Sequence, residues 1–398
     1  MRRLLLPAFV ALAGAAACGW TQLVGYTWSD YEVANEGPFR ALVHGDLGTF
    51  FHQAPIEGPS LLLRAPFAFG AWAWGASDMA IYRMVAVPGL LAGAVLGVVL
   101  WSLRDRLQPN GRWGLAVVLL AAANPLTLKA LELGHPEEML GAALCVGAVL
   151  AAVWKRPYLA AALLGLALAN KAWAVLAIGP VLLALDRHHW RVLLIACAIP
   201  ALVVAPFLLA GAGARGAVLS AGGTDAVFQP WQIWWPLGEQ GHHIHGMFGD
   251  LKVGYRAAPG WIAPVTHPLI ALLVVPATLF WRRRRPGDRS LDVLLLLTLL
   301  FLARCVLDVA NNAYYHLPFL MALLAWEALR RERPPVLSLA AASLVWITVV
   351  ELPARVSPDL QAAAYLAWTL PAIAVLAWAV FRLPVPRFAV YRQQPQRA

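Results

Sequence analysis

Long apolar runs separated by short polar stretches follow one another along the whole of this 398-residue chain. Most runs can cross the roughly 30 Å hydrocarbon core of a bilayer as a helix, at about 1.5 Å per residue. The pattern predicts an all-α polytopic membrane protein, a bundle of about ten to twelve transmembrane helices. The predicted spans cover residues 4–24, 80–103, 113–128, 139–154, 192–209, 262–281, 291–307, 314–329, 336–350 and 360–381.

One apolar stretch, residues 158–185, does not fit a simple crossing of the membrane. It lies between basic residues at 155–156 and at 187–191, and it is too short for two full crossings. We therefore expect a re-entrant pair of short helices that enter the membrane and turn back, with Asn170 and Lys171 at the bend. Irregular backbone at that depth is tolerated only where protein or a water-filled cavity surrounds it.

Two long segments, residues 25–77 and 211–261, interrupt the apolar runs. In the first, residues 31–44 are predicted to form a helix that lies on the membrane surface. The following apolar stretch is interrupted by Arg64 and Pro66, and we expect it to dip into the interface. Since no soluble domain stands apart, the sequence predicts a single integral membrane domain, residues 1–398, which ends in a basic tail over residues 382–398.

Composition agrees with the prediction of a membrane protein, and the distribution of charge predicts the orientation of the chain in the membrane. The chain is 61% hydrophobic and 13% charged, whereas about 25% of a soluble domain is charged. Of the 31 Lys and Arg residues, 21 fall in alternate connections and at the two ends, which should therefore face the cytoplasm. The net charge of +10 then reflects topology and not a nucleic acid partner. In this orientation the two long segments are extracytoplasmic loops. The frequent Ala, Arg, Gly, Pro and Trp residues indicate a bacterium with a GC-rich genome, so the membrane is predicted to be the bacterial plasma membrane.

The first apolar run allows a second interpretation. Its basic start and the Ala-rich pattern at residues 11–17 are also typical of a cleaved signal peptide. We favour an uncleaved first span, because a polytopic protein needs no cleavage and the run continues to Val24.

Polar side chains that could carry chemistry concentrate on the predicted outer side. Most acidic residues and histidines fall in the outer segments, whereas the inner loops are short and basic. We therefore expect a site at the outer face, where a lipid-borne donor is more plausible than a nucleotide. The four cysteines lie in or beside apolar runs without CxxC spacing, so they are interpreted as packing residues; neither a metal nor a cofactor is predicted.

Asp30 follows the first span and is flanked by aromatic residues. One interpretation is an interfacial aromatic belt in which Ser29 or Asp30 caps a helix. The other is a general base that takes a proton from an acceptor hydroxyl. Glu36, on the same predicted helix, is a candidate for binding the substrate.

The outer turn Gly134-His135-Pro136-Glu137-Glu138 opens the span at 139–154. Acidic residues in the first turn of a helix interact favourably with its dipole, which is the structural interpretation. In the functional interpretation, His135, Glu137 and Glu138 bind the substrate through sugar hydroxyls or hold a cation.

Lys171 lies within an apolar stretch, where an unpaired ammonium group is costly. Its side chain could extend toward the inner face, or it could contact a lipid phosphate. Arg304 and Arg83 present weaker versions of the same argument.

Two further groups remain open to either interpretation. His242, His243 and His245 are adjacent, but no second pair has zinc spacing, so we interpret them as part of a solvated loop. His316 at the outer start of a late span is either an interface residue or a substrate-binding residue. The Trp-rich residues 228–236 suit an interface belt or sugar stacking.

Taken together, these motifs resemble the C-type glycosyltransferases that use polyprenyl-phosphate sugars, nearest to glycosyltransferase family 87, the mannosyltransferase-like group. The resemblance covers most of residues 25–185 and fades after residue 185. The chain departs from the family at Gly134-His135-Pro136-Glu137, where the family often has Gly-Gln and an Asn. Three segments carry the resemblance. The first runs from Asp30-Tyr31 to Gly45-Asp46, and the third is Tyr315-His316-Leu317-Pro318-Phe319. The second begins with Gly134-His135 to Ala148 and continues with Arg156-Pro157, the small-residue run that ends in Asn170-Lys171, and Pro180.

The resemblance implies an inverting sugar transfer outside the membrane, from a polyprenyl phosphate to a hydroxyl of a glycolipid or polysaccharide. It implies that the Asp of the first loop, here Asp30, is the base, and that no bound metal is required. The residues alone leave a transporter or lipid flippase open as an alternative, although such proteins often show internal repeats and bind near the midplane. An inactive scaffold subunit of an envelope complex is a third interpretation.

Overall fold

The computed structural model describes residues 2–24, 29–54, 58–108, 113–211, 228–240, 244–245, 251–288 and 290–382. In chain order the helices begin with α1 (Arg2–Val24), α2 (Ser29–Ala34), α3 (Glu36–Val43), α4 (Leu47–Gln53), α5 (Gly58–Ala68), η1 (Phe69–Trp74), α6 (Asp78–Leu107), α7 (Gly114–Ala122), α8 (Pro125–Glu132), α9 (Glu137–Val153) and α10 (Pro157–Asn170). They continue with η2 (Ala172–Ala177), α11 (Ile178–Ala184), α12 (His189–Leu209), η3 (Trp235–Leu237), α14 (Ile262–Leu272), α15 (Val274–Arg284), α16 (Val293–Leu307), η4 (Ala313–His316), α17 (Leu317–Arg330), α18 (Val336–Val345), η5 (Trp346–Glu351), η6 (Leu352–Ala354) and α19 (Pro358–Arg382).

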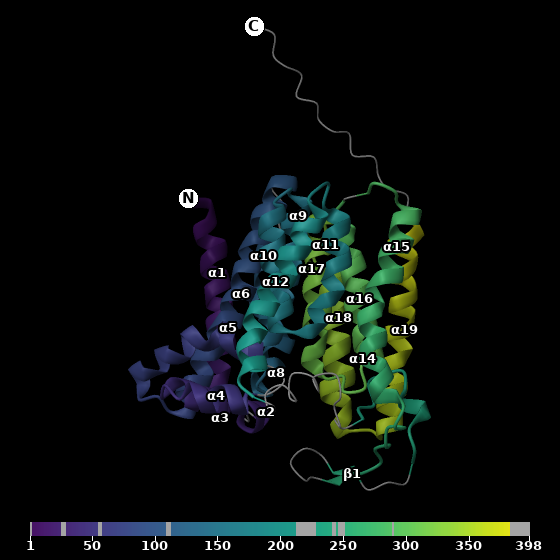
Figure 1. Ribbon diagram of the computed structural model, residues 1–398. Coiled ribbons are helices and arrows are strands. Elements are labelled where there is room, and N and C mark those ends of the chain that lie inside the picture. Colours follow the sequence, from purple (N-terminus) through teal and green to yellow (C-terminus); the bar gives the residue numbers. More distant parts are fainter. Residues whose placement is uncertain are drawn as a thin grey trace.

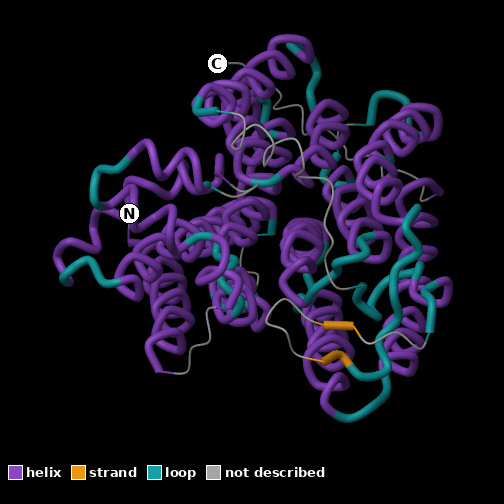
Figure 2. The backbone as a smooth tube through the Cα atoms, turned by 60° about the horizontal axis from the view of Figure 1, so that its bottom comes forward, coloured by secondary structure: helices purple, strands orange, loops and turns teal. Residues whose placement is uncertain are grey.

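Most of these helices run side by side in one bundle, with α1 at one side and α15 and α19 at the other (Figure 1). The short helices α2, α3 and α4 lie at one end of the bundle, at the bottom of Figure 1. The two strands β1 (Ile244–His245) and β2 (Leu251–Lys252) also lie at this end and pair antiparallel, as the tilted view in Figure 2 shows. The prediction of an all-helical polytopic membrane protein is confirmed, apart from this small hairpin.

Seven helical segments among the described residues are long and apolar enough to cross a membrane. This number is lower than the ten to twelve predicted, because the helices at the centre of the bundle are short: α9 has 17 residues, α16 has 15 and α17 has 14. These three helices bury side chains around nearly their whole circumference, which is typical of helices surrounded by protein.

Prolines divide several segments that the apolar pattern predicts as continuous. The predicted helix over 31–44 is two helices, α2 and α3, separated at Asn35. A continuous helix would bring the ring of Pro38 against the carbonyl of Ala34 and would lose that hydrogen bond. The predicted span at 113–128 is likewise divided, because Asn124 caps α8 and Pro125 occupies its first position.

The segment from α10 to α11 forms a hairpin that bends at Lys171, the position that the sequence predicts. Near the start of α10, the ring of Tyr158 stacks on His188, just after α11, at 6.1 Å between centroids. At the other end of α10, the Asn170 side chain donates a hydrogen bond of 2.8 Å to the Glu137 carbonyl oxygen at the start of α9. Both ends of the hairpin therefore lie together, and its bend reaches the end of the bundle where α9 begins.

Candidate functional site

The turn between α8 and α9 brings two distant parts of the chain together. Gly134 adopts a left-handed backbone conformation with φ of 89°, which glycine tolerates best. A Cβ atom at this position would lie 2.5 Å from the backbone nitrogen of Tyr31. Only the absence of a side chain allows α2 to pack this closely, and the packing places Asp30 beside His135.

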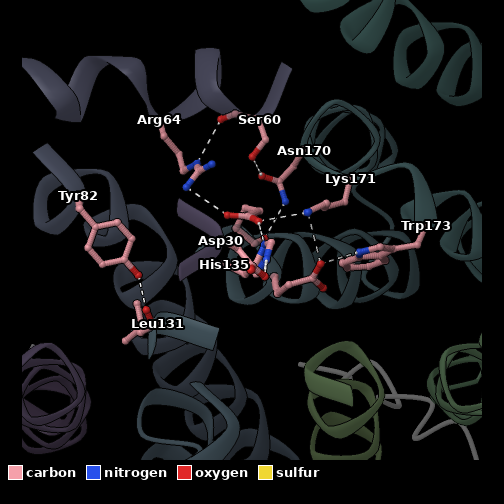
Figure 3. A network of polar contacts seen from close by, with 11 residues as sticks. Asp30, Ser60, Arg64, Tyr82, Leu131, His135, Asn170, Lys171 and Trp173 are labelled. Atoms are coloured by element: carbon pink, nitrogen blue, oxygen red, sulfur yellow. Dashed lines mark hydrogen bonds and ion pairs between the residues drawn. The ribbon is translucent and has the colours of Figure 1, made fainter. Parts of the chain in front are cut away.

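His135 bridges the carboxylates of Asp30 and Glu137, and Figure 3 shows Asp30 and His135 next to each other. Its Nε2 atom lies 2.9 Å from Oδ2 of Asp30, and its Nδ1 atom lies 2.8 Å from Oε1 of Glu137. The ring also stacks on Tyr314 of η4 at 4.3 Å between centroids. Three separate elements therefore hold the imidazole.

Glu137 is fully buried and is neutralised by two cations from other helices. Nη1 of Arg64 on α5 lies 3.1 Å from Oε2 of Glu137. Nζ of Lys171, at the C-cap of α10, lies 3.1 Å from Oε1. The Lys171 ammonium group is therefore held in an ion pair within the protein and does not extend toward a membrane face. A buried carboxylate of this kind is stable only with such partners.

Glu138 and Arg304 form the other side of the site. Glu138 accepts a hydrogen bond of 3.3 Å from Nε1 of Trp173, and its Oε1 lies 3.7 Å from the Lys171 ammonium. Its Oε2 atom is buried and has no hydrogen-bond partner within the described part of the chain. The guanidinium of Arg304 lies 5.0 Å from the Trp173 ring centroid and 4.5 Å from that of Tyr315.

The charge of Arg304 is not paired directly. Arg304 is 4% exposed, and its hydrogen bond runs from Nη1 to the Tyr315 carbonyl oxygen at 3.3 Å. Among the described residues it makes no ion pair with a carboxylate. A buried guanidinium usually requires a compensating anion. From the sequence, Arg304 presents only a weaker version of the argument made for Lys171, as a cation within an apolar stretch.

A layer of uncharged hydrogen bonds holds these side chains in place. Oγ of Ser60 donates to Oδ1 of Asn170 at 3.0 Å, and Arg64 donates through Nε to the Ser60 carbonyl oxygen at 3.3 Å. Together with the bond from Asn170 to the Glu137 carbonyl, these contacts join α5, α9 and α10 (Figure 3). The site is therefore built on three packed helices.

We refer to these residues as the Glu137 cluster: Asp30, Arg64, His135, Glu137, Glu138, Lys171, Trp173 and Arg304. Four of the predicted substrate-binding residues, together with Asp30, come together here. Arg64 and Trp173 are additions from the tertiary structure, and Arg304, to which the sequence gives a weaker version of the argument for Lys171, also belongs here.

Two predicted site residues lie outside the Glu137 cluster. Glu36 forms an ion pair with Arg40, which also binds Asp78. Partial burial and the nearby Asp78 carboxylate raise the pKa of Glu36. His316 is fully buried, and its Nε2 atom lies 2.8 Å from the Tyr365 hydroxyl.

The prediction of no metal site concerns above all the adjacent histidines His242, His243 and His245. His242 and His243 lie outside the described residues, as do the residues that follow β1. Elsewhere in the described chain, no group of three or more His, Cys, Asp or Glu side chains is arranged to hold a metal ion.

Asp30 is the carboxylate of the Glu137 cluster that is most exposed to solvent. Its side chain is 24% exposed, whereas that of Glu137 is fully buried. One carboxylate oxygen contacts His135, and the other oxygen, Oδ1, makes no polar contact with the described residues. The arrangement can therefore accept a proton at Oδ1 from a hydroxyl group, with several cations nearby to hold an anion.

Comparison with known proteins identifies the family of this chain. The family model described as glycosyltransferase family 87 matches residues 58–307, more than half of the chain. The match includes every charged residue of the Glu137 cluster except Asp30, and it extends well beyond residue 185, where the sequence analysis judged that the resemblance fades. No curated protein and no solved structure matched the chain.

This match distinguishes between the interpretations that the sequence left open. It favours an enzyme over a transporter or a scaffold, since the matched family is defined by glycosyl transfer. The cluster of charged side chains at one end of a helical bundle is consistent with such an activity. The protein therefore belongs to glycosyltransferase family 87 and is an integral membrane glycosyltransferase.

Proposed function

We propose that the protein transfers a sugar, with mannose as the first candidate, from a polyprenyl-phosphate donor to a hydroxyl group of an extracytoplasmic glycolipid or polysaccharide. The observation that carries this proposal is the Glu137 cluster, in which an accessible carboxylate lies next to several buried cations. A transferase of this kind needs a base for the acceptor and positive charge for the departing phosphate.

Asp30 is the general base in this mechanism. Its Oδ1 atom removes the proton of the acceptor hydroxyl while the hydroxyl oxygen attacks C1 of the sugar from the face opposite the phosphate. The bond between C1 and the phosphate oxygen breaks, and its electron pair stays on the polyprenyl phosphate. Attack from the opposite face inverts the configuration at C1, and neither a metal nor a cofactor supplies a step.

Lys171 and Arg304 would bind the donor phosphate. Lys171 lies beside both glutamates, and Arg304 has no ion pair with a carboxylate among the described residues. A phosphodiester at this position would supply the anion that the buried guanidinium lacks. Positive charge placed here also stabilises the phosphate as it leaves. Glu138, which lies beside Lys171, would contact the sugar hydroxyls, and Trp173, which lies beside Arg304, would contact the sugar ring.

The orientation in the membrane follows from the basic connections. Residues 1–398 form a single integral membrane domain of the bacterial plasma membrane, with its N-terminus and the tail from residue 382 in the cytoplasm. The loops at 25–77 and 211–261 and the Glu137 cluster face outward. The hairpin of α10 and α11 is the re-entrant pair, and counting α9, α16 and α17 as crossings gives about ten spans.

This orientation can be tested by labelling single cysteines with a membrane-impermeant maleimide. The starting protein has Cys18, Cys145, Cys197 and Cys305 replaced by Ser. In intact cells, cysteines at positions 46 and 241 should be labelled, and a cysteine at position 283 should be labelled only after the cells are broken. Labelling of position 283 in intact cells would contradict the orientation.

The activity can be tested in membranes that contain the protein, with radiolabelled polyprenyl-phosphate mannose, arabinose and glucose as alternative donors. We expect one donor to label a lipid or polysaccharide product, and membranes without the protein to yield none. Transfer from nucleotide sugars in place of all three lipid donors would overturn the donor class. Analysis of the product linkage tests inversion.

A further inference from the structure

We infer that His135 is a positioning residue that carries a proton on both ring nitrogens and thereby fixes the Asp30 carboxylate in the orientation needed for catalysis. This inference rests on the proposed function, in which Asp30 is the base. It goes further by assigning a charge state and a role to a side chain that contacts neither the donor nor the acceptor.

The first argument is the geometry of the two hydrogen bonds. The ring nitrogens of His135 lie 2.9 Å from an oxygen of Asp30 and 2.8 Å from an oxygen of Glu137. An ionised carboxylate can only accept hydrogen bonds, whereas a neutral imidazole has one N–H group and one bare nitrogen. Two ionised carboxylates on opposite sides of the ring therefore require the imidazolium form.

A neutral ring would require a proton on one of the two carboxyl groups instead. Glu137 is a poor place for that proton, because Arg64 and Lys171 lie 3.1 Å from its two oxygens and favour the charged form. The Asp30 side chain is 24% exposed, so water can solvate its carboxylate. The imidazolium is the arrangement in which every one of these groups keeps its preferred charge.

The charges that surround the ring support the same assignment. Three carboxylates face it or lie next to its partners, namely Asp30 on α2 and the two glutamates that open α9. Three permanent cations balance them: Arg64 on α5, Lys171 at the end of α10 and Arg304 on α16. Within this set, the positive charge of a protonated His135 lies between two of the carboxylates.

Rigidity explains why the bridge would matter for catalysis. Asp30 belongs to α2, a helix of six residues, which by itself would hold a side chain poorly. His135 connects it to Glu137, which is anchored by Arg64 and Lys171. The Tyr314 ring stacked on the imidazole fixes the ring plane. A base held by an oriented partner reacts more efficiently than one that samples several rotamers.

The charge state can be measured without any substrate. The full-length protein is labelled with ¹⁵N-histidine and reconstituted in nanodiscs, and the ring nitrogens are observed by NMR at neutral pH. We expect one histidine with two protonated ring nitrogens whose signals disappear in His135→Gln and remain in His52→Gln, a change of an exposed histidine on α4. One protonated and one bare nitrogen at His135 would overturn the inference.

The positioning role is tested by turnover and chemical rescue, with polyprenyl-phosphate mannose as the probe donor. His135→Ala should lower kcat roughly 10- to 100-fold, with a much smaller change in the KM for the donor. Imidazole, whose protonated form has two N–H groups, should restore part of the activity. 1-Methylimidazole, whose protonated form has one, should not.

Unchanged kcat in His135→Ala, or equal rescue by both compounds, would overturn the positioning role. His135→Gln repeats the kinetic test if His135→Ala does not accumulate in the membrane. Failure of the proposed function gives a different result, because the wild-type protein would then transfer no mannose while the NMR measurement would still report the charge state.

Discussion

Two buried groups of charged side chains lie toward opposite ends of α17, and they differ in how completely their charges are paired. The Glu137 cluster lies near the start of α17, where Tyr314 stacks on His135. Near the end of α17 lies a second group, the Asp292 cluster: Arg285, Asp288, Asp292, Trp326 and Arg330. With 14 residues, α17 separates the two by about 20 Å.

In the Asp292 cluster, the central carboxylate is saturated. Asp292 accepts hydrogen bonds from Trp326 at 3.2 Å, from Nε of Arg330 at 2.9 Å and from Nη1 of Arg285 at 3.0 Å. Arg285 also donates to the Ala379 carbonyl oxygen at 2.9 Å. These bonds join α15, α16, α17 and α19 and leave no oxygen of Asp292 for a ligand, so the Asp292 cluster holds helices together.

The Glu137 cluster uses the same residue types but leaves some of them incompletely paired. Oε2 of Glu138 has no hydrogen-bond partner within the described chain, and Arg304 has no carboxylate partner there. Each such group costs about 1–3 kcal/mol in a buried position. Proteins tend to retain local costs of this kind at functional sites. This difference in the pairing of the carboxylates supports the proposal that the Glu137 cluster binds a ligand, whereas the Asp292 cluster is a structural ion network.

Removing the base should produce the largest effect on activity. Asp30→Asn keeps the shape of the side chain but removes its basicity. We expect turnover to fall roughly 100-fold or more, the usual scale for a lost general base, while the protein accumulates normally. Turnover is measured in one membrane preparation beside Glu32→Gln and Asp46→Asn. If Asp30→Asn stays near wild-type turnover while one of the others fails, the base is misassigned.

Removing a cation from the Glu137 cluster should act on the donor. A hydrogen bond to a charged group contributes about 1.5–3 kcal/mol, so Lys171→Met and Arg304→Met should each raise the apparent KM for the donor roughly tenfold or more. Arg83→Met is the matched control, since Arg83 is exposed. Unchanged donor dependence in a variant that accumulates normally would make that cation a structural residue.

Breaking the Asp292 cluster should change stability with little effect on turnover. Asp292→Asn removes a buried charge from two arginines, which costs on the order of 3 kcal/mol. We expect a lower Tm in detergent, with kcat per folded molecule within about twofold of wild type. Glu332→Gln, at an exposed position of the same end, should leave both unchanged. A selective loss of kcat in Asp292→Asn would remove the functional distinction between the clusters.

Asp46 lies outside both clusters, and its substitution should have a smaller effect than the others. Oδ1 of Asp46 accepts a hydrogen bond of 3.0 Å from the Thr49 backbone and caps α4, and hydrogen bonding to Thr49 lowers the pKa of Asp46. Because its pKa is lowered in the folded protein, its contribution to stability is present above the ordinary aspartate pKa and is lost as the pH falls through the lowered value.

Asp46→Ala should therefore increase hydrogen exchange in residues 47–53 at neutral pH, whereas Asp46→Asn should keep the cap. The difference between wild type and Asp46→Ala should shrink in acid. Turnover should stay unchanged in both variants. Equal exchange in wild type and Asp46→Ala at neutral pH would contradict the capping role.

The apolar pattern was sufficient to predict the helical class and most helix positions. Every predicted span corresponds to a helix or an interrupted helix, with shifts of a few residues at the ends. The breaks within helices were not predicted where a proline divides an apolar run, because hydropathy contains no information about the missing backbone N–H group of proline. Lys171 became a candidate because an ammonium group within an apolar stretch is costly, whereas residues 30, 135, 137 and 138 became candidates because they lie on the predicted outer side, next to the ends of apolar runs.

The sequence by itself determined the membrane class and the bend at Lys171, and it supplied most charged residues of the Glu137 cluster as candidates, because periodicity and position next to an apolar run are local properties. Only the tertiary structure decided which of these residues meet. Asp30 and His135 are 105 positions apart, and they touch because Gly134 lets the backbone of Tyr31 approach. The same packing brings in Arg64 and Arg304 and leaves Glu36 and His316 outside, since pairing depends on how helices pack and not on their individual patterns.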